Sequence, residues 1–112
     1  MLNADELDEL KSLSSNPVPL TEGGFEFVFM LKVKMPAGCT PSEVDLLLCP
    51  QTKDGYATRL YFSEQVTGPK SLNWNGSVRI AERNWVAYSW QGVASDQRLL
   101  QILLGHLDAF KR

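Results

Sequence analysis

The clearest pattern along the chain is an alternation of apolar and other residues over positions 25–35. A period of two sustained over this length predicts a β-strand with one apolar face. The mostly apolar run 44–49 and the alternating run 56–62 predict two further strands. Because only short turns separate the three, they are expected to pair as an antiparallel meander. The apolar face of the first strand is predicted to consist of Phe25, Phe27, Phe29, Leu31, Val33 and Met35.

Helical spacing of apolar residues marks the two ends of the chain. Residues 3–14 predict a short amphipathic helix with Asn3 as its N-cap, and residues 95–110 predict a second helix with Ser95 as its N-cap. Residues 14–19 are expected to end the first helix and to form a stiff linker, because they contain two prolines. The apolar stripes of the two helices are predicted to be Leu7, Leu10 and Leu13, and Leu99, Leu103, Leu107 and Phe110.

Neither period runs through residues 73–90, which hold all three tryptophans. Asn75 and Gly76 favour a tight turn that needs positive φ, and Val78 with Ile80 suggests a fragment of strand. Large aromatic residues in an irregular segment suggest a surface loop that is held in place by its side chains. The chain is therefore predicted to be an α+β domain with an N-terminal helix, an antiparallel β-meander of three to four strands, an irregular aromatic flap and a C-terminal helix.

Composition excludes several classes of protein. Residues 1–112 are enough for a single domain with its own core. A hydrophobic content of 44% and a net charge of −2 exclude a disordered chain and give no support to nucleic-acid binding. The first residues lack the pattern of a signal peptide, and no apolar run is long enough to cross a bilayer. A cytoplasmic protein without a membrane partner is the expectation.

Few residues could carry chemistry. Cys39, in the turn 37–41, is expected to be exposed, and an ordinary loop cysteine is favoured over a nucleophile because no base or cation adjoins it in sequence. Cys49 ends an apolar strand and is predicted to be a buried structural thiol. His106 lies on the flank of the last helix without a second ligand one turn away, so no metal site and no cofactor are expected. The acidic residues of the first helix, Asp5, Glu6, Asp8 and Glu9, are expected to form a solvated face.

The order of the elements and the sequence of the flap resemble the ubiquitin-conjugating enzyme superfamily. In that family a helix precedes an antiparallel meander. A long flap then carries an HPN motif and, after an Asn-Gly turn, an acceptor cysteine in a pattern like NGxIC; a tryptophan and a helix follow. The corresponding residues here are Gly68-Pro69-Lys70, then Asn75-Gly76-Ser77-Val78-Arg79-Ile80, then Trp85 and the helix from Ser95. Trp85, Tyr88, Ser89, Gly92, Val93 and Asp96 are also similar to the tail of family E of the prokaryotic conjugating-like proteins.

The chemistry that this resemblance implies is not supported at the reactive position. In the family, the cysteine thiolate takes the C-terminus of a ubiquitin-like protein as a thioester and passes it to a lysine. Arg79 stands at that position, and its guanidinium presents only hydrogen-bond donors and cannot accept an acyl group. The histidine and asparagine of the HPN motif are also absent, so the family's support for the developing oxyanion is lost.

The resemblance therefore implies a non-catalytic conjugating-enzyme-like protein of a bacterial ubiquitin-like modification system. Its expected partners are a ubiquitin-like protein, an activating-enzyme-like protein, or both. Two alternatives stay open, namely an active conjugating enzyme that uses Cys39 and an unrelated α+β interaction or assembly module. The residues of the flap that are expected to bind partners are Asn75, Gly76, Arg79, Trp85, Tyr88 and Trp90.

Overall fold

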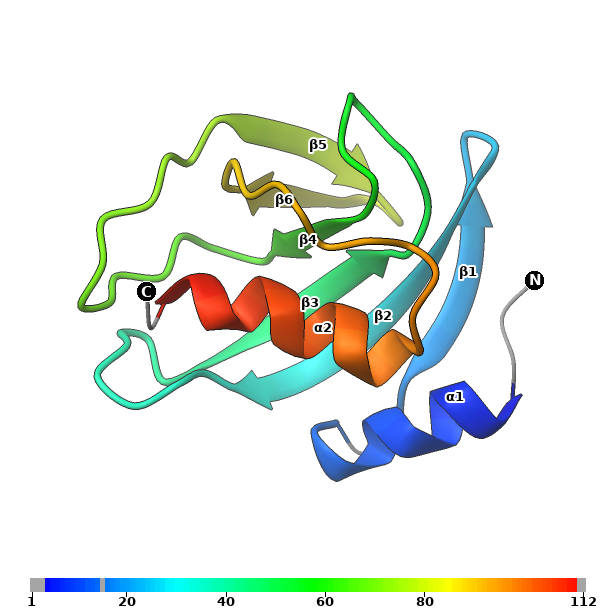
Figure 1. Cartoon of the computed structure of the whole chain (residues 1–112), viewed down its shortest axis with the longest axis horizontal. Coiled ribbons are helices and arrows are strands. Elements are labelled where there is room, and N and C mark those ends of the chain that lie inside the picture. The colour runs from blue at the N-terminus through cyan, green and yellow to red at the C-terminus, as the bar shows by residue number, and fades with distance from the viewer. Residues whose placement is uncertain (1–3, 15, 111–112) are drawn as a thin grey trace.

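The computed structural model of the protein describes residues 4–14 and 16–110 and confirms the α+β class (Figure 1). An N-terminal helix precedes six strands, and a second helix ends the described part of the chain. No helix within it has the length and apolar character needed to span a membrane. In chain order the elements are α1 (Ala4–Glu9), η1 (Leu10–Ser12), β1 (Val18–Glu22), β2 (Phe25–Lys34), β3 (Glu43–Cys49), β4 (Arg59–Phe62), β5 (Gly76–Ile80), β6 (Arg83–Ala87), α2 (Leu99–Leu107) and η2 (Asp108–Phe110).

The six described strands form one antiparallel sheet in the order β1-β2-β3-β4-β6-β5. The predicted meander is confirmed, because β2, β3 and β4 pair consecutively. The sheet curls into half of a barrel, since the rings of Phe29 on β2 and Trp85 on β6 lie only 5.8 Å apart although two strands separate β2 from β6. Helix α2 lies across one face of this sheet, and the opposite face lines the inside of the curl (Figure 1).

Strand β2 does not keep the single apolar face that its alternation predicts. Its pairing with β3 shifts between Met30 and Val33, and Lys32 between them has a φ of 52°. Such a bulge inserts one residue and exchanges the two faces of the strand. Phe27 therefore belongs to the cluster inside the curl, whereas Val33 belongs to the core beneath α2 and Leu31 is 44% exposed. Both faces of β2 carry apolar side chains into a core.

The segment predicted as a stiff linker contains the start of a strand, β1. Val18 to Glu22 pair with Phe29 to Phe25 of β2, so the chain resumes regular structure before the linker was expected to end. The prolines suggested a break, but β1 is an edge strand, where a proline is tolerated because its missing N–H faces away from the sheet. With β1, the meander has four strands, β1 to β4, and the hairpin of β5 and β6 completes the sheet.

The predicted N-terminal helix is confirmed, as α1 and η1 together. Leu10 is fully buried, and Leu7 and Leu13 pack against the same core. Asn3, predicted to cap this helix, lies outside the described residues.

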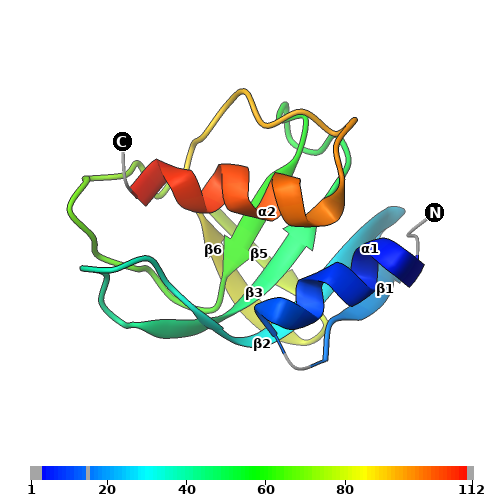
Figure 2. The same cartoon turned by 60° about the horizontal axis from the view of Figure 1, so that its bottom comes forward.

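The C-terminal helix begins four residues later than predicted, at Leu99 rather than Ser95. The N–H group of its first residue, Leu99, donates to Glu6 Oε2 of α1 over 2.9 Å. Arg98 Nε also donates to Glu9 Oε1 over 2.9 Å. Glu6 and Glu9 therefore do not belong to a purely solvated face. They fix α1 against the N-terminal end of α2, as Figure 2 shows.

Candidate functional site

Residues 76–87 of the predicted irregular flap form a regular β-hairpin, so the irregular flap is wrong over this range, whereas the strand fragment predicted at Val78 and Ile80 is confirmed as part of β5. Strand β5 pairs with β6 from Gly76 opposite Ala87 to Ile80 opposite Arg83. The turn of the hairpin is Ala81-Glu82, whose φ angles are 54° and 63°. Positive φ at both central residues is the conformation of a type I′ turn, which matches the twist of the two strands.

Asn75-Gly76 is not the tight turn that the sequence predicts, and Gly76 begins β5 without a positive φ. Glycine is required here for a different reason. A Cβ atom at this position would lie 2.6 Å from Arg59 Nη2, a distance at which one of the two groups must move. Gly76 therefore allows the close approach of a side chain from β4 to the backbone of β5.

Arg59 is the buried cation at this end of the curl, with 7% of its surface exposed. Its guanidinium carbon lies 4.3 Å from the centre of the Tyr56 ring, and Nη2 donates to Asn75 Oδ1 over 2.8 Å. The nearest carboxylate oxygen, Asp54 Oδ2, is 3.9 Å from Nη1. Arg59 Nε is buried and has no hydrogen-bond partner among the described residues. The stacking on Tyr56 and the amide of Asn75 thus contribute most of what holds this charge in place.

Polar side chains surround the outer end of Arg59. The Tyr56 hydroxyl donates to Ser89 Oγ over 3.1 Å and accepts from Asn75 Nδ2 over 3.2 Å. The hydrogen bonds with Ser89 and Asn75 lower the pKa of Tyr56. Asn75, one of the residues predicted to bind partners, therefore has an internal role in which its amide joins Arg59 to Tyr56.

Arg79 lies on β5 with its side chain exposed, as its predicted role in partner binding requires. Its Nη1 donates to Asn84 Oδ1 on the neighbouring strand over 3.3 Å. No ion pair of Arg79 with a carboxylate is found among the described residues. The position that resembles the acceptor site of conjugating enzymes therefore presents an exposed guanidinium on a regular strand.

Cys39 is buried, so the expectation of an exposed thiol is wrong. Only 8% of the residue is exposed, and its Sγ would lie 3.1 Å from a Cβ atom built on Gly68. The turn that carries Cys39 is held by the backbone pairing of Thr40 with Thr67. Burial raises the pKa of the Cys39 thiol, and burial is also the first cause of the raised pKa of Cys49. Cys49 is fully buried, as predicted.

The aromatic residues of the hairpin and of the chain after it are directed into the protein. Trp85 is fully buried, and its Nε1 donates to Ile80 O over 3.0 Å. The Tyr88 hydroxyl donates to the carbonyl of His106, and Trp90, which is partly exposed, donates from Nε1 to Gly105 O over 3.2 Å. These contacts attach residues 85–90 to β5 and α2. Among the residues predicted to bind partners, Asn75 and Arg79 are exposed, and Asn75 is engaged with Arg59 and Tyr56.

His106 is buried in the core beneath α2, with 2% of its surface exposed. Thr58 Oγ1 donates to Val93 O over 2.8 Å and lies 2.8 Å from His106 Nε2. Because the threonine hydroxyl has a single proton, Nε2 carries the hydrogen that completes the second bond. Burial, and then the charge of Arg59, lower the pKa of His106 to about 4. This histidine is neutral at pH 7 and has a structural position.

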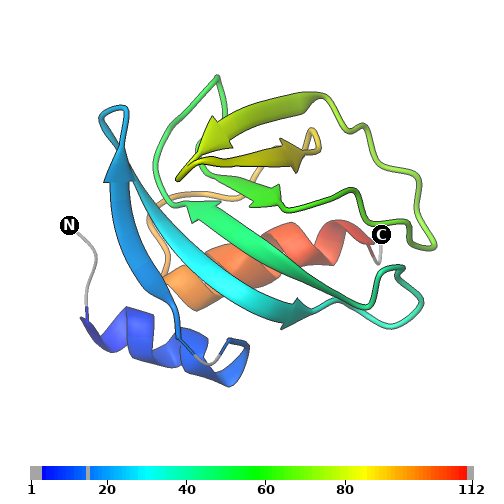
Figure 3. The same ribbon diagram turned by 180° about the vertical axis from the view of Figure 1, so that it is seen from behind.

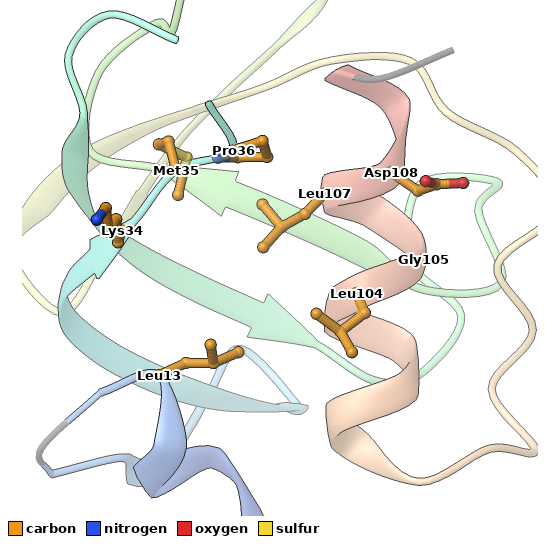
Figure 4. A pocket seen from close by; sticks show the side chains of 8 residues that line it. All are labelled: Leu13, Lys34, Met35, Pro36, Leu104, Gly105, Leu107 and Asp108. Carbon is orange, nitrogen blue, oxygen red and sulfur yellow. The ribbon is translucent and has the colours of Figure 1, made fainter. Parts of the chain in front are cut away.

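A shallow apolar cleft of about 610 Å³ runs beside α2 (Figure 4). Lys34 and Asp108 lie at opposite sides of it, and Leu104, 48% exposed, projects from the helix. No group of three or more histidine, cysteine, aspartate or glutamate side chains suited to a metal ion is present in residues 4–14 and 16–110. The apolar residues that line the cleft are Leu13, Met35, Pro36, Leu104 and Leu107.

Comparison of the chain with family models, with curated proteins and with solved structures finds no match.

Proposed function

We propose that the protein is a non-catalytic relative of ubiquitin-conjugating enzymes that binds partners in a bacterial ubiquitin-like modification system. The resemblance in sequence supports the family. The order of a helix, an antiparallel meander and a second helix across the sheet is compatible with it. The expected partners are a ubiquitin-like protein and an activating-enzyme-like protein.

The proposal that the protein is non-catalytic rests on one observation, namely that the described residues include no accessible thiol. Arg79 occupies the position of the acceptor cysteine, and it cannot form a thioester. Cys39 and Cys49 are both buried, and burial raises the pKa of each thiol, which lowers the fraction of the nucleophilic thiolate. The alternative of an active enzyme that uses Cys39 requires an opening of the turn against Gly68.

The test is to incubate the protein with ATP, a bacterial ubiquitin-like protein and its activating-enzyme-like protein, and to measure the intact mass of the protein. We expect no adduct on the protein, together with saturable binding to one of the two partners. A thiol-labile adduct that disappears in Cys39→Ala would refute the non-catalytic assignment. Cys49→Ala is the matched control, because it removes the other buried thiol from a different part of the sheet.

The β5–β6 hairpin favours a second candidate, an unrelated α+β interaction module. The resemblance places an irregular flap over these residues, whereas they extend the sheet by two strands. In that case neither partner of a ubiquitin-like system binds. The same incubation separates the two proposals, because an absence of binding to both partners supports the interaction module alone.

A further inference from the structure

Strand β5 is one of the two edges of the described sheet, and its outer side pairs with no other described strand (Figure 3). Hydrogen-bonding groups alternate in direction along an antiparallel strand, so every second residue of β5 presents its N–H and C=O to the open edge. An edge of this kind is a template for an added strand. Neither proline nor glycine interrupts Ser77 to Ile80.

The other edge, β1, is less suited to accept a strand. It contains Pro19, which has no N–H to offer, and Pro17 precedes it. The tips of the two hairpins meet where the Ala81 N–H donates to Glu22 Oε1 over 3.1 Å, and β1 and β5 diverge from this point (Figure 3). Of the two edge strands that border this opening, β5 is therefore available for pairing with an added strand and β1 is not.

The inner side of this opening has mainly apolar walls. A cleft of about 220 Å³ lies between the β1–β2 hairpin and β5. The side chains of an added strand that point inward would meet these walls, which removes apolar surface from water. Glu22, Lys53 and Arg79 also line the cleft. The Lys53 Nζ is paired with Asp54 Oδ2 at 2.8 Å, and Glu22 Oε1 accepts from the Ala81 N–H. The apolar residues of the walls are Phe25, Phe27, Val78 and Ile80.

Strand β5 carries a positive charge at Arg79, which is exposed and lies at the border of the cleft. Arg79 donates a hydrogen bond to the neutral amide of Asn84 and pairs with no carboxylate among the described residues. An acidic side chain on an added strand would lie across from Arg79 and form an opposite-charge cross-strand pair. A second copy of β5 would instead bring two Arg79 side chains to one sheet face, which disfavours self-association at this edge.

We propose that β5 binds an extended acidic peptide of a partner as an additional strand, with alternate apolar side chains in the cleft and acidic side chains beside Arg79. This inference rests on the proposed function, because it names the binding mode of the surface around Arg79. The backbone hydrogen bonds contribute affinity, and the alternation of apolar and acidic residues determines specificity.

The probe is the synthetic peptide Ac-Val-Glu-Val-Glu-Val-amide, followed by amide chemical shifts of the ¹⁵N-labelled protein. The control is the same peptide with lysine in place of glutamate. We expect the shifts to concentrate on β5 and the acidic peptide to bind about two- to fivefold more tightly than the basic one at low salt. N-methylation of alternate peptide nitrogens should abolish binding, because it removes donors that a strand needs.

Two charge reversals decide the role of Arg79. Arg79→Glu should invert the preference between the two peptides, whereas Lys34→Glu, an exposed charge at the far end of β2, should leave it unchanged. Equal binding of both peptides, shifts centred on α2, or unaltered binding of the N-methylated peptide would overturn the inference. An adduct in the thioester experiment refutes the proposed function but leaves peptide binding at β5 intact, so the two failures are distinguishable.

Discussion

Lowering the pH from 7 to 5 should reduce the free energy of unfolding by about 2 kcal/mol through one buried side chain, His106. The imidazole is 2% exposed, and its Nε2 donates to Thr58 Oγ1 over 2.8 Å. Burial and the nearby charge of Arg59 disfavour the imidazolium, which lowers the pKa from 6.5 to about 4. In the unfolded chain the same group is solvated and protonates near its ordinary value.

The direction of the effect follows from proton binding. At every pH between about 4 and 6.5 the unfolded chain binds more protons at His106 than the folded protein, so acid favours unfolding. The contribution is fully present above the unfolded pKa, falls by about 1.4 kcal/mol per pH unit below it, and is exhausted below the folded pKa. The whole difference corresponds to about 3 kcal/mol, of which about 2 kcal/mol is lost by pH 5.

The measurement is urea unfolding at several pH values from 7 to 5, followed by tryptophan fluorescence. His106 is the single histidine of the chain, so no other imidazole contributes in this range. His106→Gln keeps a hydrogen-bond donor but does not titrate, and its unfolding free energy should change by less than that of the wild type. Equal losses in the two proteins, or an NMR titration midpoint for His106 above pH 6, would refute the reasoning.

Three further outcomes are expected. Thr58→Val should lower the free energy of unfolding by about 1–3 kcal/mol, because it leaves the Val93 carbonyl and His106 Nε2 without their partner; an unchanged urea midpoint would contradict this. Cys39 should react with iodoacetamide far more slowly in the folded protein than in urea, measured by intact mass, because its thiol is covered; rapid labelling of the native state would show that the turn opens. Gly68→Ala should destabilise by about 1–3 kcal/mol, since its Cβ would lie 3.1 Å from Cys39 Sγ, and Cys39→Ala should recover part of the loss; additive losses in the double variant would argue against this contact.

The prediction of a tight turn from local sequence was wrong at one position, and the structure shows why. Asn75-Gly76 has the composition of a hairpin turn, but the glycine is needed for the close approach of Arg59 from β4. The real turn, Ala81-Glu82, lacks the glycine that usually marks it. Nothing in the local sequence distinguishes a glycine required by its own φ from one required by a side chain that is distant in sequence.

The irregular appearance of residues 73–90 has a similar origin. Neither face of β6 is reserved for solvent, because Trp85 and Ala87 enter the core inside the curl while Val86 packs against the core beneath α2. A strand that is buried on both sides loses the alternation that would identify it. The curl of the sheet, which brings Phe29 against Trp85, creates this second core.

Local sequence patterns by themselves determined the helices at both ends and the three strands of the meander, because the helices bury a regular stripe and the strands are apolar runs separated by short turns. The tertiary structure alone decided whether a chemical group is accessible. Cys39 lies in a turn that is predicted to be exposed, but its thiol is buried against Gly68, and Arg59 is buried although its side chain is charged. Burial depends on neighbours that are distant in sequence. The local sequence therefore determines the helices and strands, and the packing of these elements determines which side chains can reach a partner or a reactant.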